Sequence, residues 1–272
     1  MTCSSLCQPG RGLSCFACCP PIRPAGYDHA DHRGSLRRLF SESRAAHLRG
    51  ELPLRPMVGY SCPGLGFLDG AGRMVGCLLH PARHPELGPG QDPRLATGYA
   101  AKCARESCPQ ARAYAEIKPS VQARLLGLCE GLDAFAFSSP RENPARLLLA
   151  FGPVVTAAAM ELDGLSLDTL RDWRWLRECQ PAWGWLLGLA LEQAGAELLL
   201  WPHLDLALAK AAAGLARDLG PSPPLEQGGP LSGHCEEWEA RLWLALSGRR
   251  RLTAGRLANW RALARRAAEA LA

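Results

Sequence analysis

The segment Cys15-Phe-Ala-Cys18-Cys19 places three thiols within five residues, and two of them are adjacent. Thiolates at such short spacing are soft ligands that suit zinc ions and iron–sulfur centres. Nine of the chain's twelve cysteines lie within the first 108 residues, so the segment belongs to a wider cysteine-rich region. The sequence therefore predicts that a bound metal organises the N-terminal part of the chain.

The composition limits the kind of protein this is. Of 272 residues, 47% are hydrophobic and 21% are charged, which suits one large core or two small ones and not a disordered charged chain. The net charge of +5 is carried almost entirely by arginine. No helix-turn-helix, zinc-finger or aromatic RNA-binding pattern accompanies it, so we expect no nucleic-acid partner. A basic helix near the C-terminal end could bind an acidic protein partner or a membrane surface, although a solvated face over a packed apolar stripe is favoured.

Targeting signals are not visible in the sequence. The first seven residues have neither the basic stretch nor the apolar segment of a secretory signal. The longest nearly apolar run, 147–160, contains Gly152 and Pro153 and is too short to span a bilayer. We therefore expect a cytoplasmic protein without a transmembrane segment, in which reduced cysteines bind metal or act in catalysis rather than form disulfides.

Composition changes near residue 110. The first part is rich in Cys, Gly, Pro and His and is interrupted by turns, so it buries little apolar surface without a metal. The rest is rich in Leu, Ala, Trp and Arg at helical spacing. We predict a mainly α protein, with a small irregular cysteine-rich metal-binding domain over 1–110 and an α-helical, bundle-like domain over 111–272.

Apolar spacing also predicts the individual helices. Asn143 is expected to cap a helix that runs from Ala145, with Pro144 in its first turn, and Ser166 is expected to cap a later helix. We interpret the Leu, Ala and Trp stripes as helix-packing faces rather than as a cofactor pocket. The expected helices cover 36–48, 111–135 with a kink or break at Pro119, a stretch from 145, 166–179, 182–195, 204–219, 235–247 and 253–272.

The candidate metal ligands are early cysteines. A chain reversal between Cys15 and Cys18 would turn both sulfurs toward one metal, whereas the side chain of Cys19 diverges from its neighbour and would serve a second metal, another edge of a cluster, or neither. Proline follows three of these cysteines, and its fixed backbone could hold a ligand sulfur in place. The candidates are Cys7, Cys15, Cys18, Cys19, Cys62, Cys77, Cys103 and Cys108.

Other side chains and motifs are weaker candidates. His29, His32, His80 and His84 could add imidazole ligands, but ordinary hydrogen-bonded roles are favoured. Cysteines 129, 179 and 235 are expected to be small buried hydrophobes. The bacterial ferredoxin run, the Cys-x3-Cys-x2-Cys signature of radical chemistry, a Gly-x-Ser-x-Gly elbow and a phosphate loop are all absent from the sequence.

The cluster at 15–19, followed by Cys62-Pro-Gly-Leu and Cys77, resembles the YkgJ-type cysteine-cluster family, which is described as zinc- or iron-chelating. The resemblance covers about residues 7–108. Gly12 stands where the family has its first cysteine, and the segment after Cys77 lacks the family's next one. The residues that match by position are Cys15, Cys18, Cys19, Cys62 and Cys77.

The resemblance implies a zinc ion or an iron–sulfur cluster. We expect a structural or accessory metal-binding protein. The family includes flagellin lysine N-methylases, thought to carry an iron–sulfur centre, so an iron–sulfur enzyme that modifies protein side chains is an alternative. A thiol redox switch at Cys18–Cys19 or at Cys103 and Cys108 is a third hypothesis, which requires exposed thiols of low pKa. The sequence leaves open whether the protein is an enzyme.

Overall fold

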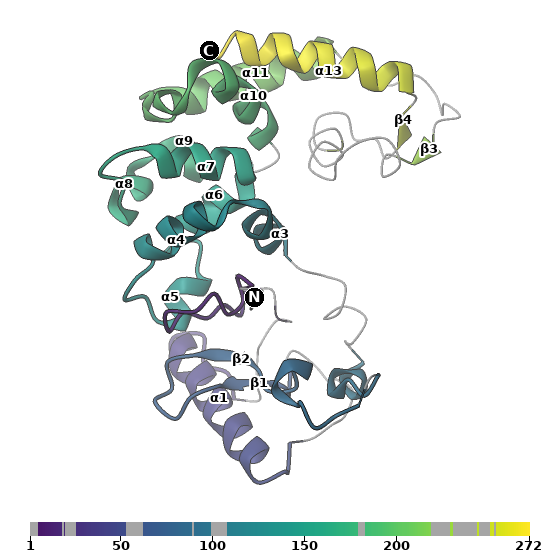
Figure 1. Cartoon of the computed structure of the whole chain (residues 1–272). Helices are drawn as coiled ribbons and strands as arrows, with labels where there is room; N and C mark the ends of the chain where they lie inside the picture. The colour runs from purple at the N-terminus through teal and green to yellow at the C-terminus, as the bar shows by residue number, and fades with distance from the viewer. Residues whose placement is uncertain are drawn as a thin grey trace. The chain divides into compact units, whose positions relative to one another are not determined.

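The chain is mainly helical, as predicted (Figure 1). The computed structural model describes residues 5–17, 19, 26–52, 62–88, 90–98, 108–178, 183–218, 229–230, 244, 251–252 and 254–272. These ranges contain eleven α-helices and two two-stranded sheets. The chain divides into two compact units, which we call unit 1 (Met1–Ala115 and Cys129–Asn143) and unit 2 (Glu116–Leu128 and Pro144–Ala272).

Unit 1 is built on one helix and one hairpin. Helix α1 (His32–Leu48) begins at Asp31, whose carboxylate accepts a 2.9 Å hydrogen bond from the N–H of Gly34. The helix predicted over 36–48 is therefore confirmed and starts one turn earlier. In Figure 1, α1 lies beside the antiparallel hairpin of β1 (Leu65–Phe67) and β2 (Val75–Cys77) and contacts β1.

The core of unit 1 is a cluster of four phenylalanines. The ring of Phe40 on α1 is fully buried. Its centroid lies 5.3 Å from that of Phe16 and 5.6 Å from that of Phe67, both edge-on. Phe135 completes the cluster, 5.4 Å from Phe16 and 5.8 Å from Phe40. Such aromatic packing adds to the free energy gained by burying the rings.

The segment 129–143 belongs to unit 1, although the composition placed it in the helical domain. Arg33 on α1 donates to both carboxylate oxygens of Glu142, at 2.6 and 2.5 Å. The hydroxyl of Ser138 accepts a 3.0 Å hydrogen bond from the N–H of Phe16. Together with Phe135 in the core, these contacts join the segment to α1 and to Phe16. A domain boundary at residue 110 predicts instead that the segment packs with the helices that follow it.

The helical stretch predicted over 111–135, with a kink or break at Pro119, is three helices. They are α3 (Pro109–Glu116), α4 (Pro119–Leu128) and α5 (Ala134–Ser138). The break at Pro119 is confirmed. The second break was not predicted. It falls where Gly131 adopts a φ of 83°, a backbone conformation that residues other than glycine rarely adopt.

Asn143 does not cap the next helix, so that prediction is wrong. Helix α6 (Ala145–Phe151) has no side-chain cap. The buried amide of Asn143 instead donates to the carbonyl of Phe137 at 3.2 Å and accepts from the thiol of Cys129 at 3.4 Å. Because the side chain is buried, its hydrogen bonds to α5 and to Cys129 replace a bond to the helix end.

Unit 2 is a set of short helices. Ser166 caps α8 as predicted, since its hydroxyl accepts a 3.0 Å bond from the N–H of Thr169. Gly152, at a φ of 111°, separates α6 from α7, and Pro153 starts α7. The other helices of this unit are α7 (Pro153–Glu161), α8 (Leu167–Asp172), α9 (Arg174–Glu178), α10 (Gly184–Ala194), α11 (Leu204–Asp218) and α13 (Ala254–Glu269).

The helices expected over 204–219 and 253–272 are confirmed as α11 and α13, and that over 182–195 as α10. The stretch expected over 166–179 is divided between α8 and α9, and the helix expected over 235–247 lies outside the described residues, apart from Leu244. Short elements complete the described structure: η1 (Pro81–Arg83), η2 (Pro93–Thr97), η4 (Ala196–Leu200), β3 (Gly229–Pro230) and β4 (Arg251–Leu252).

The apolar stripes pack helix against helix in unit 2, as predicted. Trp260 of α13 is fully buried, and its ring lies 4.8 Å from that of Trp185 on α10. In the same unit, the indole N–H of Trp175 donates to the carbonyl of Leu199 at 3.0 Å. In the part of the chain that the structure describes, no helix is both long and apolar enough to cross a membrane.

Substituting two glycines of α10 should separate a steric requirement from helix propensity. A methyl group on Gly184 would overlap the carbonyl of Phe151, whereas one on Gly188 would make ordinary contact with Val154 at 3.7 Å. We expect Gly184→Ala to destabilise unit 2, and Gly188→Ala to be neutral or stabilising by up to about 1 kcal/mol. Urea unfolding followed by tryptophan fluorescence measures both. Equal effects of the two substitutions would contradict the close approach at Gly184.

The Phe40→Ala substitution should loosen unit 1, because truncating a fully buried phenylalanine costs about 3–5 kcal/mol. Hydrogen exchange of peptides from α1 and the β1–β2 hairpin should become much faster. The control is Leu48→Ala on the same helix, where the side chain is 68% exposed. A similar loss of protection in both variants would show that Phe40 does not hold this core.

Candidate metal centre

Cys7 and Cys15 lie on adjacent backbones. The N–H of Cys15 donates to the carbonyl of Cys7 at 2.9 Å, because the segment 5–17 folds back on itself through two short turns. Cys15 is buried, at 5% exposure, and Cys7 is partly buried. The structure thus brings together two of the predicted ligand positions that are eight residues apart in sequence.

The same segment is bonded to strand β2. The hydroxyl of Ser14, fully buried, accepts a 2.8 Å hydrogen bond from the N–H of Val75. The side-chain amide of Gln8 lies 3.0 Å from where a Cβ on Gly76 would be. The segment carrying Cys7 and Cys15 therefore lies directly beside the strand that ends at Cys77. Sequence reasoning missed Ser14, since a single serine carries no spacing signal.

Cys62 and Cys77 each begin a turn at the same end of the β1–β2 hairpin. The carbonyl of Cys62 accepts from the N–H of Leu65 at 3.2 Å, and that of Cys77 accepts from the N–H of His80 at 3.3 Å. Leu65 is the strand partner of Cys77, so the register places both turns at this end. The hairpin thus brings together two cysteines that are fifteen residues apart.

A third turn begins at Phe16, directly after Cys15. The N–H of Cys19 donates to the carbonyl of Phe16 at 3.0 Å, so the chain reverses directly after Cys15, where a reversal was predicted. Cys18 lies outside the described residues. Cys19 and Cys62 are both partly buried, and both pack against the apolar cluster that contains Phe40. Five candidate cysteines (Cys7, Cys15, Cys19, Cys62 and Cys77) therefore lie in segments tied to one core.

Cys108 has a structural role that the sequence reasoning did not foresee. It precedes α3, and its sulfur accepts a 3.4 Å hydrogen bond from the N–H of Ala111, while its carbonyl accepts from the same N–H at 2.9 Å. The residue thus caps the first turn of the helix. Cys103 lies outside the described residues.

His84, which lies seven residues after Cys77, is held by protein groups. One ring nitrogen of His84 lies 2.8 Å from the carbonyl of Leu78, and the other lies 3.1 Å from the carboxylate of Glu86. This arrangement agrees with the favoured interpretation of His84 as a hydrogen-bonded side chain. The ring of His47 on α1 packs edge-on against the ring of His84, and the two ring centroids are 5.8 Å apart. Burial lowers the pKa of His47, and the charges of His84, Arg83 and Arg44 lower it further.

The described cysteines do not form a complete ligand set among themselves. Within the described ranges, no three His, Cys, Asp or Glu side chains lie close enough together to hold a metal ion. Two of the eight predicted ligands, Cys18 and Cys103, are not among these residues. The metal site therefore stays a prediction.

Comparison with known proteins adds no relative: no family model, no curated protein and no solved structure matches the chain. The YkgJ-type assignment accordingly stays a resemblance in the cysteine spacing.

Removing the Ser14 hydroxyl should detach the cysteine segment from β2. The Ser14→Ala substitution leaves the buried N–H of Val75 without its acceptor, which costs about 1–3 kcal/mol. Amide exchange at Val75, measured by NMR, should become correspondingly faster. Ser41→Ala, at an exposed position of α1, serves as the control and should leave this amide unchanged. Unaltered exchange at Val75 in Ser14→Ala would show that the Ser14 hydroxyl does not hold the cysteine segment against β2.

Proposed function

We propose that this protein binds a metal, either zinc or an iron–sulfur cluster, and that the metal has a structural or accessory role. The proposal rests chiefly on the hydrogen bond between Ser14 and Val75, because it joins the segment of Cys7 and Cys15 to the hairpin of Cys62 and Cys77. Cysteines far apart in the sequence thereby lie on neighbouring segments. A cytoplasmic location is part of the proposal, because thiols are kept reduced there.

The donor chemistry fits such a group. Thiolate sulfur is the ligand that zinc and iron–sulfur centres prefer, and a structural zinc site closes with four protein ligands. Cys15, Cys18, Cys62 and Cys77 would supply four sulfurs from the two joined segments. Cys7 and Cys19 would complete a second site or a cluster. When bound, the metal would cross-link segments that bury little apolar surface.

The protein's own residues hold the segments that carry several candidate cysteines without the metal. Turns that begin at Phe16, Cys62 and Cys77 reverse the chain beside Cys15, Cys19, Cys62 and Cys77. The partly buried side chains of Cys19 and Cys62 rest on the phenylalanine core, which limits their motion. Such preorganisation lowers the conformational entropy that metal binding would have to overcome.

Metal analysis of the full chain, purified without oxygen, tests the proposal. We expect bound zinc or iron in a fixed ratio to protein, and near-complete loss of that metal in Cys77→Ser, because a serine hydroxyl is a poor ligand for either metal. The matched control is Cys129→Ser. Cys129 is buried, its thiol donates to Asn143 at 3.4 Å, and it is not one of the candidate ligands.

The same sample separates the remaining alternatives. Colourless protein with stoichiometric zinc excludes the iron–sulfur enzyme. A brown protein whose visible absorbance is bleached by reductant supports an iron–sulfur cluster. Protein without metal whose cysteines oxidise reversibly would contradict the proposal and support the redox switch.

A further inference from the structure

A hollow of about 450 Å³ lies between α1 and the loop that joins β1 to β2. On the helix side it is lined by Arg37, Ser41 and Arg44, which are spaced four and three residues apart and so share one face. On the hairpin side it is lined by Phe67 and the short loop after Asp69. It contains none of the candidate metal ligands.

Arg44, which lines the hollow, has no acidic partner among the described residues. Arg44 donates from Nη1 to the carbonyl of Phe67 at 3.3 Å, and no carboxylate among the described residues forms an ion pair with it. The loop lies close to this side chain, since a Cβ on Gly70 would be 4.0 Å from Nη2 of Arg44, an ordinary van der Waals distance. The guanidinium is thus oriented by a neutral acceptor, which leaves its charge available to a ligand.

Arg37 is held in place but shares its charge. Its Nη2 donates to Asp133 at 3.2 Å, and its guanidinium lies 5.0 Å from the centre of the Phe135 ring. These contacts fix the side chain at the edge of the hollow. The ion pair with one carboxylate oxygen of Asp133 uses one end of the Arg37 guanidinium. The remaining N–H groups of that guanidinium can bind a second anion.

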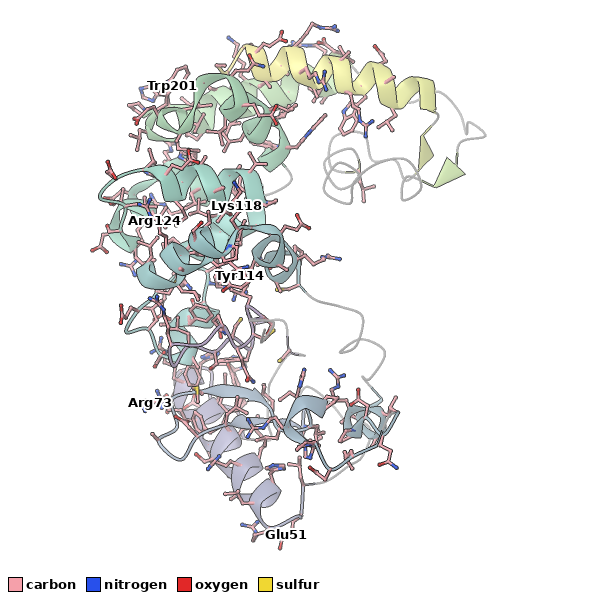
Figure 2. All side chains as sticks on the ribbon, in the orientation of Figure 1. Glu51, Arg73, Tyr114, Lys118, Arg124 and Trp201 are labelled. Carbon is pink, nitrogen blue, oxygen red and sulfur yellow. The ribbon has the colours of Figure 1, made fainter. Side chains whose placement is uncertain are left out.

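The one acidic residue of the lining is turned to its own loop. Asp69 Oδ1 accepts from the backbone N–H groups of Arg73 and Met74, at 2.9 and 3.2 Å. Burial raises the pKa of this carboxyl, but the two hydrogen bonds and the charge of Arg73 outweigh burial and leave the pKa below its usual value. Figure 2 labels Arg73 at this turn.

We propose that this hollow binds a small organic phosphate. Two arginines with a serine hydroxyl between them match the charge and the several acceptor oxygens of a phosphate. The volume lies within the range of small-molecule sites and exceeds what a bare phosphate fills. Leu48, 68% exposed at the hollow, and Ala45 offer an apolar surface for the rest of the ligand.

Titration of the full chain with phenyl phosphate, followed by NMR of the ligand, tests this assignment. We expect saturable binding about tenfold tighter than that of inorganic phosphate, because the phenyl ring adds apolar contact. Arg44→Gln should weaken binding about tenfold, as the loss of one charged hydrogen bond predicts. Ala71→Glu, which adds a negative charge at an exposed loop position without removing a contact, should also weaken it.

The matched control is Arg38→Gln. Arg38 is the neighbour of Arg37 on α1, does not line the hollow, and donates to the carbonyl of Gly26 at 3.1 Å. Its substitution should leave the affinity unchanged. The assignment is overturned if phenyl phosphate does not saturate, if Arg38→Gln weakens it as much as Arg44→Gln, or if benzoate binds equally well. Far-ultraviolet circular dichroism checks that each variant folds.

Discussion

The packing of Phe40 against Phe16, Phe67 and Phe135 joins four stretches of chain. Three of these stretches are short: a turn, a three-residue strand and a five-residue helix. None of them could hold a conformation alone, because short elements gain too little from their own hydrogen bonds. Burial of the shared rings supplies the stability, and α1 serves as the platform.

The candidate metal ligands depend on the same cluster. Cys15 and Cys19 flank Phe16, and Cys62 precedes the strand that ends at Phe67. Fixing the two rings therefore fixes the approximate positions of the neighbouring sulfurs. A bound metal and the phenylalanine core would stabilise each other, since each restrains the same short segments. Another face of α1, which bears Arg37 and Arg44, lines the open hollow.

Some features of the site could be predicted from the sequence. The spacing of Cys15 and Cys18 indicated a chain reversal, and a turn occurs at that place. The sequence could not show that Ser14 binds Val75 or that Cys108 caps α3, because both depend on which backbone N–H lies nearby after folding. A serine or a cysteine can accept a hydrogen bond in many settings, so its type alone selects none of them.

The sequence by itself determined the helical class and most helices of unit 2, because apolar side chains at helical spacing must face a core wherever the helix lies. Pro119 and Ser166 acted locally, through a missing donor and a capping hydroxyl, and both effects were visible in the sequence. Only the tertiary structure decided that Phe135 and Glu142 belong with α1, and that Asn143 binds Phe137 rather than α6. Those outcomes depend on partners about a hundred residues away or on burial, which a local pattern does not encode.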